Sequence, residues 1–387
     1  MKKILIINNN LHIGGVQKAL VSLLWNIWED YDVTLLLFYP GGALMKELPP
    51  EVKVIAPDSS YRYLGMSRQD TVTAKDRLGR SFYAAMTRVF GRKYATMLMG
   101  IGQKKLGGYD AVISYLHNAG DKAFLGGCCE FVLNHVSAKR KIAFLHCDYG
   151  LSGANTSYNN RLYAGFDTIA ACSQGCADSF VKVNPELADK VAVVPNCHRY
   201  DKIRALAEKA PVVMDPGKIN LLTVARLGKE KSVERALAVI AGLGALKERM
   251  HYYIVGDGSG RARLLETLNR EGLDSCVTLC GQLENPYGYM QAADLLLIPS
   301  RSEAAPLVIG EAACLGTPVL SMKTSSAVEM IADTGFGWVC ENNEAAMIRI
   351  LTDLVSEPEQ LEKVSWKLQL LEFSNQNALE GFHKCLN

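Results

Sequence analysis

The sequence predicts an α/β protein with two doubly wound domains. Short apolar runs alternate with helical patterns along nearly the whole chain, which is typical of parallel sheets with right-handed crossover connections. The chain has 387 residues, more than a single hydrophobic core usually organises. Prolines and polar residues interrupt the alternation between Pro195 and Pro216. We therefore expect one domain before this break and a second domain after it.

The first series of strands belongs to the N-terminal half. Each apolar run ends in polar or small residues before a helical pattern, as the buried strands of a parallel sheet do. The first run is too short for the apolar region of a secretory signal, so we expect a strand there. Gly14 and Gly15 follow it and open a helix from Val16 to Trp28. The predicted strands are 4–7, 33–38, 111–115, 141–145, 168–171 and 191–194.

The second series of strands begins near Lys218. Residues 201–210 have a helical pattern and predict a connecting helix between the two halves. We place the domains at 1–198 and 199–370, followed by a C-terminal segment, 371–387. The predicted strands of the second domain are 219–224, 252–255, 277–279, 294–298 and 318–321.

The composition is that of an ordinary globular protein. Hydrophobic residues make up 49% of the chain and charged residues 21%, and no apolar run reaches the roughly 18 residues of a membrane-spanning helix. The 11 cysteines are irregularly spaced, so we expect reduced core cysteines in the cytoplasm and no metal site. The sole Asp-x-Asp motif, Asp30-Tyr31-Asp32, lies on the side opposite the expected ligand edge. No cofactor is predicted.

Positive charge is concentrated between Arg62 and Lys105. This segment holds ten Lys and Arg residues against Asp70 and Asp76, with aromatic and methionine side chains between them. One interpretation is a solvated helical face. The other is attachment to an anionic membrane surface, with the apolar side chains entering the lipid interface. No nucleic-acid-binding motif accompanies the charge, so we expect no nucleic acid partner.

Two carboxylates, Glu303 and Glu311, stand on either side of a predicted junction between a strand and a helix. The strand at 294–298 precedes Glu303, and Pro306 suits the first turn of the following helix. In open α/β sheets, ligands bind at the carboxyl ends of the strands. Arg226 and Lys231 follow another strand, 219–224, at the same predicted edge. Two cations and two carboxylates in this position suit the diphosphate and the hydroxyl groups of a sugar nucleotide.

These residues and several short motifs resemble the retaining GT-B glycosyltransferases of the family-4 type. The resemblance runs nearly from end to end, and its specificity comes from the order and spacing of the motifs. It implies the GT-B architecture, in which two Rossmann-like domains face each other across a cleft, with the final helix crossing back onto the first domain. The motifs are Gly14-Gly15-Val16-Gln17, Phe144-Leu145-His146, Val194-Pro195-Asn196, Arg226 with Lys231, Gly256-Asp257-Gly258, Gly281-Gln282-Leu283 and the paired glutamates.

The resemblance also implies roles for individual residues. Arg226 and Lys231 would clamp the donor diphosphate and stabilise the leaving group without a metal. Glu311 would bind the ribose hydroxyls, and Glu303 the hydroxyls of the donor sugar. The backbone N–H groups of Leu307 and Val308 would lie near the phosphates.

Further roles fall on the glycine loop, a histidine and a leucine. Gly14 and Gly15 would let the backbone approach the phosphate or the acceptor. His146 would face the donor sugar near the reacting carbon, although His117 ends a neighbouring strand and competes for that role. The backbone of Leu283 would pair with the nucleobase.

One departure from the family pattern affects the sugar pocket. Ala304 and Ala305 stand where the family commonly has glycine and an aromatic residue, which matters if that backbone needs a positive φ.

A glycosyltransferase acting with retention on a saccharide or lipid-linked acceptor, in cell-surface polysaccharide synthesis, is the expected function. The alternatives are a catalytically inactive GT-B partner subunit and a sugar-nucleotide epimerase. We expect a cytoplasmic protein that can be peripheral on the inner face of the membrane.

Overall fold

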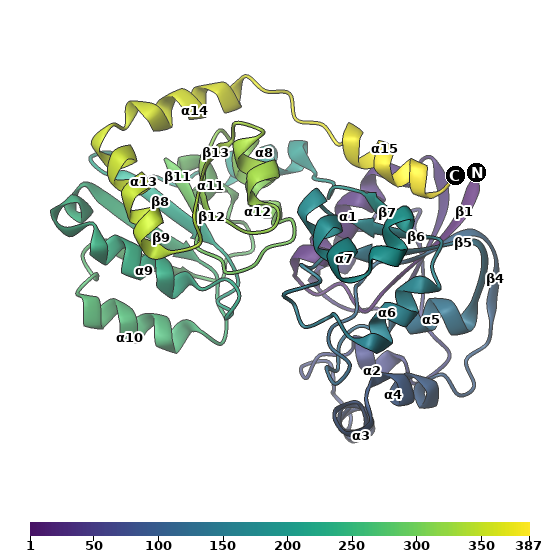
Figure 1. Cartoon of the computed structure of the whole chain (residues 1–387). Coiled ribbons are helices and arrows are strands. Elements are labelled where there is room, and N and C mark those ends of the chain that lie inside the picture. The colour runs from purple at the N-terminus through teal and green to yellow at the C-terminus, as the bar shows by residue number, and fades with distance from the viewer. The chain divides into compact units, whose positions relative to one another are not determined.

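The computed structural model describes residues 1–387, which divide into two compact units (Figure 1). The first unit comprises Met1–Cys197 together with Asn375–Asn387, and the second comprises His198–Ser374. Each unit has a parallel sheet with helices packed on it. The predicted α/β class with two doubly wound domains is therefore confirmed.

The first unit contains a seven-stranded sheet in the order β3-β2-β1-β4-β5-β6-β7. The strand order runs outward in both directions from β1 and β4, which is the doubly wound topology. Apolar residues near the centre of this sheet, such as Ile6, Leu35 and Ile113, are completely buried. Helix α1 contributes Leu20, Leu24 and Ile27 to the same core. The strands are β1 (Lys2–Asn8), β2 (Tyr31–Leu37), β3 (Lys53–Ile55), β4 (Leu106–Ser114), β5 (Val136–Leu145), β6 (Thr168–Ala171) and β7 (Val191–Val193).

The second unit contains a six-stranded sheet in the order β10-β9-β8-β11-β12-β13. Here β8 and β11 are the central pair from which the order runs outward. Two apolar clusters cover the two faces of this sheet. The strands are β8 (Ile219–Val224), β9 (Met250–Val255), β10 (Val277–Gly281), β11 (Leu295–Ile298), β12 (Val319–Met322) and β13 (Gly337–Cys340).

Most helices are crossover connections between strands, and three of them follow one another in the basic segment. In the first unit they are α1 (Gly15–Ile27), α2 (Arg62–Gly65), α3 (Ala74–Phe90), α4 (Arg92–Met99), α5 (Cys128–His135), α6 (Ser157–Ala164) and α7 (Gln174–Val183). In the second unit they are α8 (Tyr200–Lys209), α9 (Val233–Gly242), α10 (Arg261–Glu271), α11 (Tyr287–Ala292), α12 (Leu307–Ala313), α13 (Glu344–Ser356) and α14 (Glu359–Gln369). Helix α8 instead connects the two sheets, and α13 and α14 follow the last strand of the second sheet. No helix of the structure combines the length and the apolar character needed to span a lipid bilayer.

The last helix, α15 (Gln376–Cys385), belongs to the first unit although it follows the second in the chain (Figure 1). Its apolar face contributes Ala378, Phe382 and Cys385 to the core around β1. The Lys2 ammonium donates to the backbone carbonyl of Leu386 at 3.2 Å. Packing and a terminal hydrogen bond therefore fix this helix on the first unit.

Two short strands were not predicted. β3 and β13 lie at the edges of their sheets, and most of their side chains are only partly buried. β4 and β5 also extend further toward their amino ends than predicted, through residues that remain largely accessible to solvent. Strands of this kind lack the continuous apolar run that identifies a buried strand in a sequence.

Candidate functional site

The side chains of Lys231 and Glu303 meet at the carboxyl edge of the second sheet. Lys231 follows β8 and Glu303 follows β11, and these two strands are hydrogen-bonded neighbours. The Lys231 Nζ lies 2.6 Å from Oε1 and 2.8 Å from Oε2 of Glu303. Glu303 is only 9% exposed. The structure thus places one predicted cation and one predicted carboxylate in direct contact, at the point where an open α/β sheet binds its ligands.

Neighbouring hydroxyl groups hold Glu303 in place. The Ser300 hydroxyl donates to its Oε1 at 2.7 Å, and the Ser325 hydroxyl donates to its backbone carbonyl at 2.8 Å. Because Lys231 also donates to both carboxylate oxygens, the carboxylate is well satisfied despite its burial. Contacts within the protein therefore fix the positions of both charged groups.

Arg235 on α9 anchors the start of the loop between β11 and α12. Its side chain is almost fully buried and donates to the carbonyl of Pro299 at 3.3 Å. It also donates to Oδ1 of Asn342 at 2.6 Å and to Oε1 of Glu344 at 2.7 Å. Five N–H donors in a fixed fork allow one arginine to hold several acceptors at once. The loop that carries Glu303 is consequently fixed to the helix that follows Lys231.

Arg226 lies at the same edge but has a different partner. Its Nη2 donates to Oε1 of Glu230 at 2.6 Å, and its side chain is 75% exposed. Burial opposes ionisation of Glu230, but backbone hydrogen bonding and the positive charge of Arg226 outweigh it, so the pKa of this carboxyl is lowered. The structure does not bring Arg226 against Glu303 or Glu311.

Glu311 lies in α12, in a second and more deeply buried position. It is 5% exposed, and the Tyr287 hydroxyl donates to its Oε1 at 3.1 Å. Leu307 and Val308 are the first two residues of α12, where backbone N–H groups have no acceptor within the helix. Pro306 stands one residue before the helix, with extended backbone angles. The sequence predicts this proline inside the first turn, whereas the structure has it one position earlier, as the residue that caps the helix.

The glycines after β9 allow two loop backbones to lie in contact. Gly256 has φ +141°, and a Cβ there would lie 1.8 Å from the carbonyl oxygen of Ala225. A Cβ on Gly258 would lie 2.7 Å from the carbonyl oxygen of Leu227. Backbone hydrogen bonds, including Leu227 N to Asp257 O at 3.0 Å, join the same two loops. These glycines therefore shape the loop that carries Arg226.

Leu283 and the two alanines also follow strands at this edge. Leu283 is partly buried against the apolar cluster on one face of the sheet. Ala304 and Ala305 both have negative φ, because Ser232 is the only non-glycine residue of the chain with a positive value. The backbone here therefore does not require the glycine that the family commonly has.

His146 and His117 lie side by side at the carboxyl edge of the first sheet. They stand three residues beyond Ala143 and Ser114, which are paired in β5 and β4. The ring of His146 packs on Tyr115 and Phe144 with centroid distances of 4.7 and 5.7 Å.

Both histidines are neutral at physiological pH. Burial lowers the pKa of His146 to about 3, with a contribution from His117, and burial lowers the pKa of His117 to about 4. Nε2 of His146 and Nδ1 of His117 are buried without a hydrogen-bond partner. An unpaired buried nitrogen is costly, so each ring keeps a hydrogen-bonding position unused by the protein.

Gly14 and Gly15 lie at the start of α1 without unusual backbone angles. Gly14 has an extended conformation with φ −169°, and Gly15 has no positive φ either. A Cβ on Gly15 would meet nothing within 4 Å, and one on Gly14 would meet only the flexible side chain of Gln17. The two glycines thus leave open space before the helix, rather than satisfying a backbone requirement.

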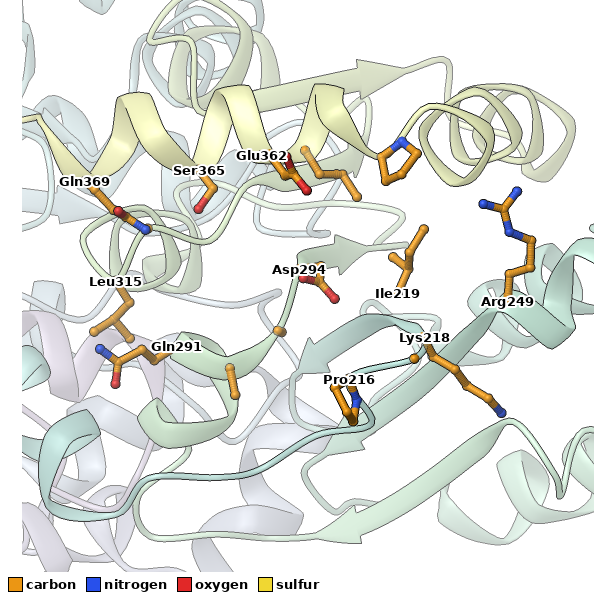
Figure 2. Close-up of a pocket in the computed structure, with 16 residues that line it drawn as sticks. Pro216, Lys218, Ile219, Arg249, Gln291, Asp294, Leu315, Glu362, Ser365 and Gln369 are labelled. Atoms are coloured by element: carbon orange, nitrogen blue, oxygen red, sulfur yellow. The ribbon is translucent and has the colours of Figure 1, made fainter.

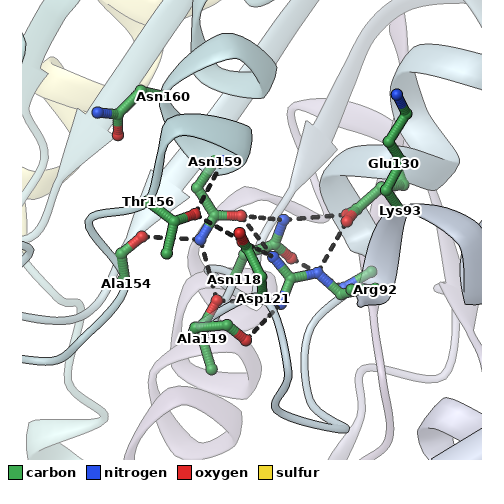
Figure 3. A network of polar contacts seen from close by, with 12 residues as sticks. Arg92, Lys93, Asn118, Ala119, Asp121, Glu130, Ala154, Thr156, Asn159 and Asn160 are labelled. Carbon is green, nitrogen blue, oxygen red and sulfur yellow. Dashed lines mark hydrogen bonds and ion pairs between the residues drawn. The ribbon is translucent and has the colours of Figure 1, made fainter. Parts of the chain in front are cut away.

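The structure corrects the sequence-based view of the basic segment at Arg92. This residue was counted among the cations of a surface, yet it is 0% exposed. Its Nε donates to Oε1 of Glu130 at 2.8 Å, and Nη1 donates to the carbonyls of Ala119 and Gly120 at 3.0 and 3.1 Å (Figure 3). Asn159 accepts from its Nη2. Arg92 is therefore an internal anchor of α4, and the remaining cations form the surface.

The cavity shown in Figure 2 lies at the opposite edge of the second sheet. Its volume is about 440 Å³, and it is lined by residues that precede strands, such as Lys218, Arg249 and Asp294. None of the predicted site residues lines it.

No group of three or more potential metal ligands occurs in the structure.

Residues 206–367 match the family model described as Glycosyl transferases group 1. This stretch, which lies within the second unit, is therefore similar to the group 1 glycosyltransferases. The chain is 28% identical over 149 residues to the amylovoran biosynthesis glycosyltransferase AmsK of Erwinia amylovora, covering 36% of this chain and 37% of that protein. It is 25% identical over 206 residues to the GDP-mannose-dependent alpha-(1-6)-phosphatidylinositol dimannoside mannosyltransferase of Mycobacterium tuberculosis, covering 52% of each. The matches thus span about half, or less, of these relatives' lengths.

Solved structures resemble this chain over both units. Anabaena Alr3699/HepE in complex with UDP-glucose superposes with a TM-score of 0.69 at 17% identity, covering 100% of this chain and 98% of that one. TarM of S. aureus, in complex with UDP among other ligands, gives a TM-score of 0.71 at 13% identity, with full coverage of both chains. The fold is therefore that of the GT-B glycosyltransferases, as predicted.

Proposed function

We propose that this protein transfers a sugar from a nucleotide diphosphate-sugar to an acceptor. The contact between Lys231 and Glu303 carries the proposal, because a cation suited to phosphate lies beside a carboxylate suited to sugar hydroxyls. The contact lies at the central strand pair of the second sheet, within the stretch that matches the family model. Relatives with names that specify a sugar nucleotide donor support the same reaction class.

In this proposal each charged residue binds a different part of the donor. Lys231 and Arg226 bind the diphosphate and stabilise the charge that develops on it as the sugar departs. Glu303 binds hydroxyl groups of the donor sugar. Glu311, which is buried about one turn into α12, binds the ribose, and Leu283 pairs with the base through its backbone.

His146 contributes a neutral imidazole with a buried nitrogen that has no partner in the protein. We propose that it meets the donor sugar near the reacting carbon, while Gly14 and Gly15 leave room for phosphate or acceptor. Two fixed cations take over the neutralisation that a metal ion provides in other enzymes of phosphate chemistry. The acceptor hydroxyl attacks from the face that the diphosphate leaves, with the leaving phosphate taking its proton, so the configuration is retained.

The acceptor is proposed to be a growing saccharide or a lipid-linked intermediate. Helix α3 supports a membrane location, because Leu78, Phe82, Ala85 and Val89 are exposed and recur at the spacing of one helical face. The exposed cations of α3 are Lys75, Arg77 and Arg88, and Lys93 is exposed on the adjoining helix α4. An apolar stripe flanked by cations is the pattern of a helix that lies on an anionic membrane. We place the protein in the cytoplasm, with reversible attachment to the inner face of the membrane.

A catalytically inactive partner subunit is the second candidate function. The two alanines after Glu303 favour it, since they alter the family pattern. The absence of a positive φ at Ala304 and Ala305 weakens this argument. An epimerase is a third candidate that needs a donor but no acceptor.

A screen with sugar nucleotides tests the proposal. Wild-type protein is mixed with UDP, GDP and their hexose derivatives, and melting temperature and nucleotide release are measured. A ligand at about 100 times Kd should stabilise the protein by about 2.7 kcal/mol. Stabilisation with slow release of the nucleotide supports a transferase, and stabilisation without any release supports the partner subunit. Conversion of the sugar while it stays on the nucleotide identifies an epimerase.

A further inference from the structure

Ser232 occupies an unusual backbone conformation between Lys231 and helix α9. Its φ of 46° and ψ of 44° lie in the left-handed region, and it is the only non-glycine residue of the chain with a positive φ. The residue is completely buried. Such conformations are unfavourable for residues with a Cβ and persist where the surroundings enforce them, often at functional sites.

The hydroxyl of Ser232 does not perform the usual task of a serine before a helix. A serine at that position normally has extended backbone angles and accepts a hydrogen bond from the first turn. Ser232 has neither feature. Its Oγ instead donates to the carbonyl of Lys229 at 2.6 Å and accepts from Nε of Arg301 at 3.1 Å. The hydroxyl therefore donates one hydrogen bond with its single proton and accepts one with a lone pair.

These two bonds join the loops that carry Lys231 and Glu303. Lys229 and Ser232 stand on the two sides of Lys231, and Arg301 stands two residues before Glu303. A backbone hydrogen bond from Arg301 N to Glu230 O, at 2.9 Å, joins the same two loops. The hydroxyl therefore fixes the turn at Lys231 and connects it to the segment that presents Glu303.

We propose that Ser232 is a positioning residue that holds Lys231 and Glu303 at the distance from each other that the sugar nucleotide requires. The inference rests on the proposed function and assigns a role to a residue that does not itself touch the donor. Lys231 binds phosphate and Glu303 binds sugar, so the reaction depends on the distance between their loops. Binding of a nucleoside diphosphate alone does not involve Glu303 and depends on this distance less.

Two substitutions separate the hydroxyl from the backbone strain. Ser232→Ala removes the hydroxyl and keeps the strained Cβ, whereas Ser232→Gly removes the hydroxyl and relaxes the backbone. If the hydroxyl positions the site, both variants should lose about tenfold in kcat with the donor that the wild type uses. Their affinity for UDP or GDP should change by less than about threefold. The glycine variant should nevertheless melt about 2 °C above the alanine variant.

A partner substitution and a control complete the experiment. Arg301→Met should reproduce the loss of kcat, and its combination with Ser232→Ala should be no slower than either single variant, because both remove the same contact. Asn343→Ala removes a helix cap of the same unit, where Oδ1 accepts from Ala346 N at 2.9 Å. This control should melt lower and keep wild-type kcat.

Three outcomes would overturn the inference while the wild type remains active. Wild-type kcat in both serine variants is the first. The second is activity that follows melting temperature, with the glycine variant restored, because it would make the effect structural. Additive losses in the double variant are the third. An inactive wild-type protein that also binds neither UDP nor GDP would instead refute the proposed function.

Discussion

Replacing Lys231 with alanine should lower donor kcat/KM by about 10- to 100-fold. The Lys231 ammonium makes two short charge-assisted contacts to Glu303, at 2.6 and 2.8 Å, which define its position in the loop. A hydrogen bond to a charged group contributes about 1.5–3 kcal/mol, and about 1.36 kcal/mol corresponds to a factor of ten in rate. One lost phosphate contact therefore gives this range. The kinetics are measured as nucleotide release over a series of donor concentrations.

The same substitution also leaves Glu303 without its cation. Ser300 still donates to the carboxylate, so the loop should stay folded, and the melting temperature should be recorded alongside the kinetics. Lys229→Ala is the matched control, since it removes a lysine from the same loop without touching Glu303. Normal kcat/KM in Lys231→Ala, or an equal loss in Lys229→Ala, would refute the assignment of Lys231 to the diphosphate.

Three further predictions concern the carboxylates, the buried arginine and the membrane. Glu303→Ala should mainly lower kcat and Glu311→Ala should mainly raise donor KM, because the ribose changes little in the transition state; the reverse pattern would exchange their roles. Arg92→Ala should lower the free energy of unfolding by about 3–5 kcal/mol, since it leaves a buried carboxylate unpaired, and a denaturation midpoint near that of the wild type would contradict this. Wild-type protein should float with anionic vesicles at low salt and not at high salt. Reversing Arg88 and Lys93 to glutamate should abolish flotation and spare donor hydrolysis, whereas unchanged flotation would exclude this surface.

Much of the fold could be predicted from the sequence, because buried strands appear there as continuous apolar runs. The strand at 168–171 was predicted with its observed limits, and so was the strand at 219–224. β3 and β13 were missed because each is short and most of its side chains are only partly buried. The amino-terminal extensions of β4 and β5 were missed because solvent-accessible residues pair there through their backbones, and backbone pairing leaves no pattern in the side chains.

The sequence allowed site residues to be predicted only where the end of a strand could be recognised. That reasoning placed Lys231 and Glu303 at one edge, and the structure brings them into contact. It could not show that Arg226 points to Glu230 and solvent, because such a choice depends on neighbouring loops. Nor could it separate Arg92 from the surface arginines, since the buried partner, Glu130, lies 38 residues away in the chain. A serine before a helix predicts an ordinary cap, so Ser232 gave no signal of its left-handed backbone.

Donor turnover in the presence of EDTA tests the central claim most directly. Wild-type protein and the Glu303→Ala variant are incubated with UDP- and GDP-hexoses, with chelator, and the released nucleoside diphosphate is quantified. If Lys231 and Arg226 neutralise the leaving diphosphate and Glu303 holds the sugar, the wild type should release nucleotide from one of these donors without a metal. The variant should release it at least about tenfold more slowly. Release that stops with EDTA and returns with magnesium or manganese, or equal release by the variant, would contradict the account.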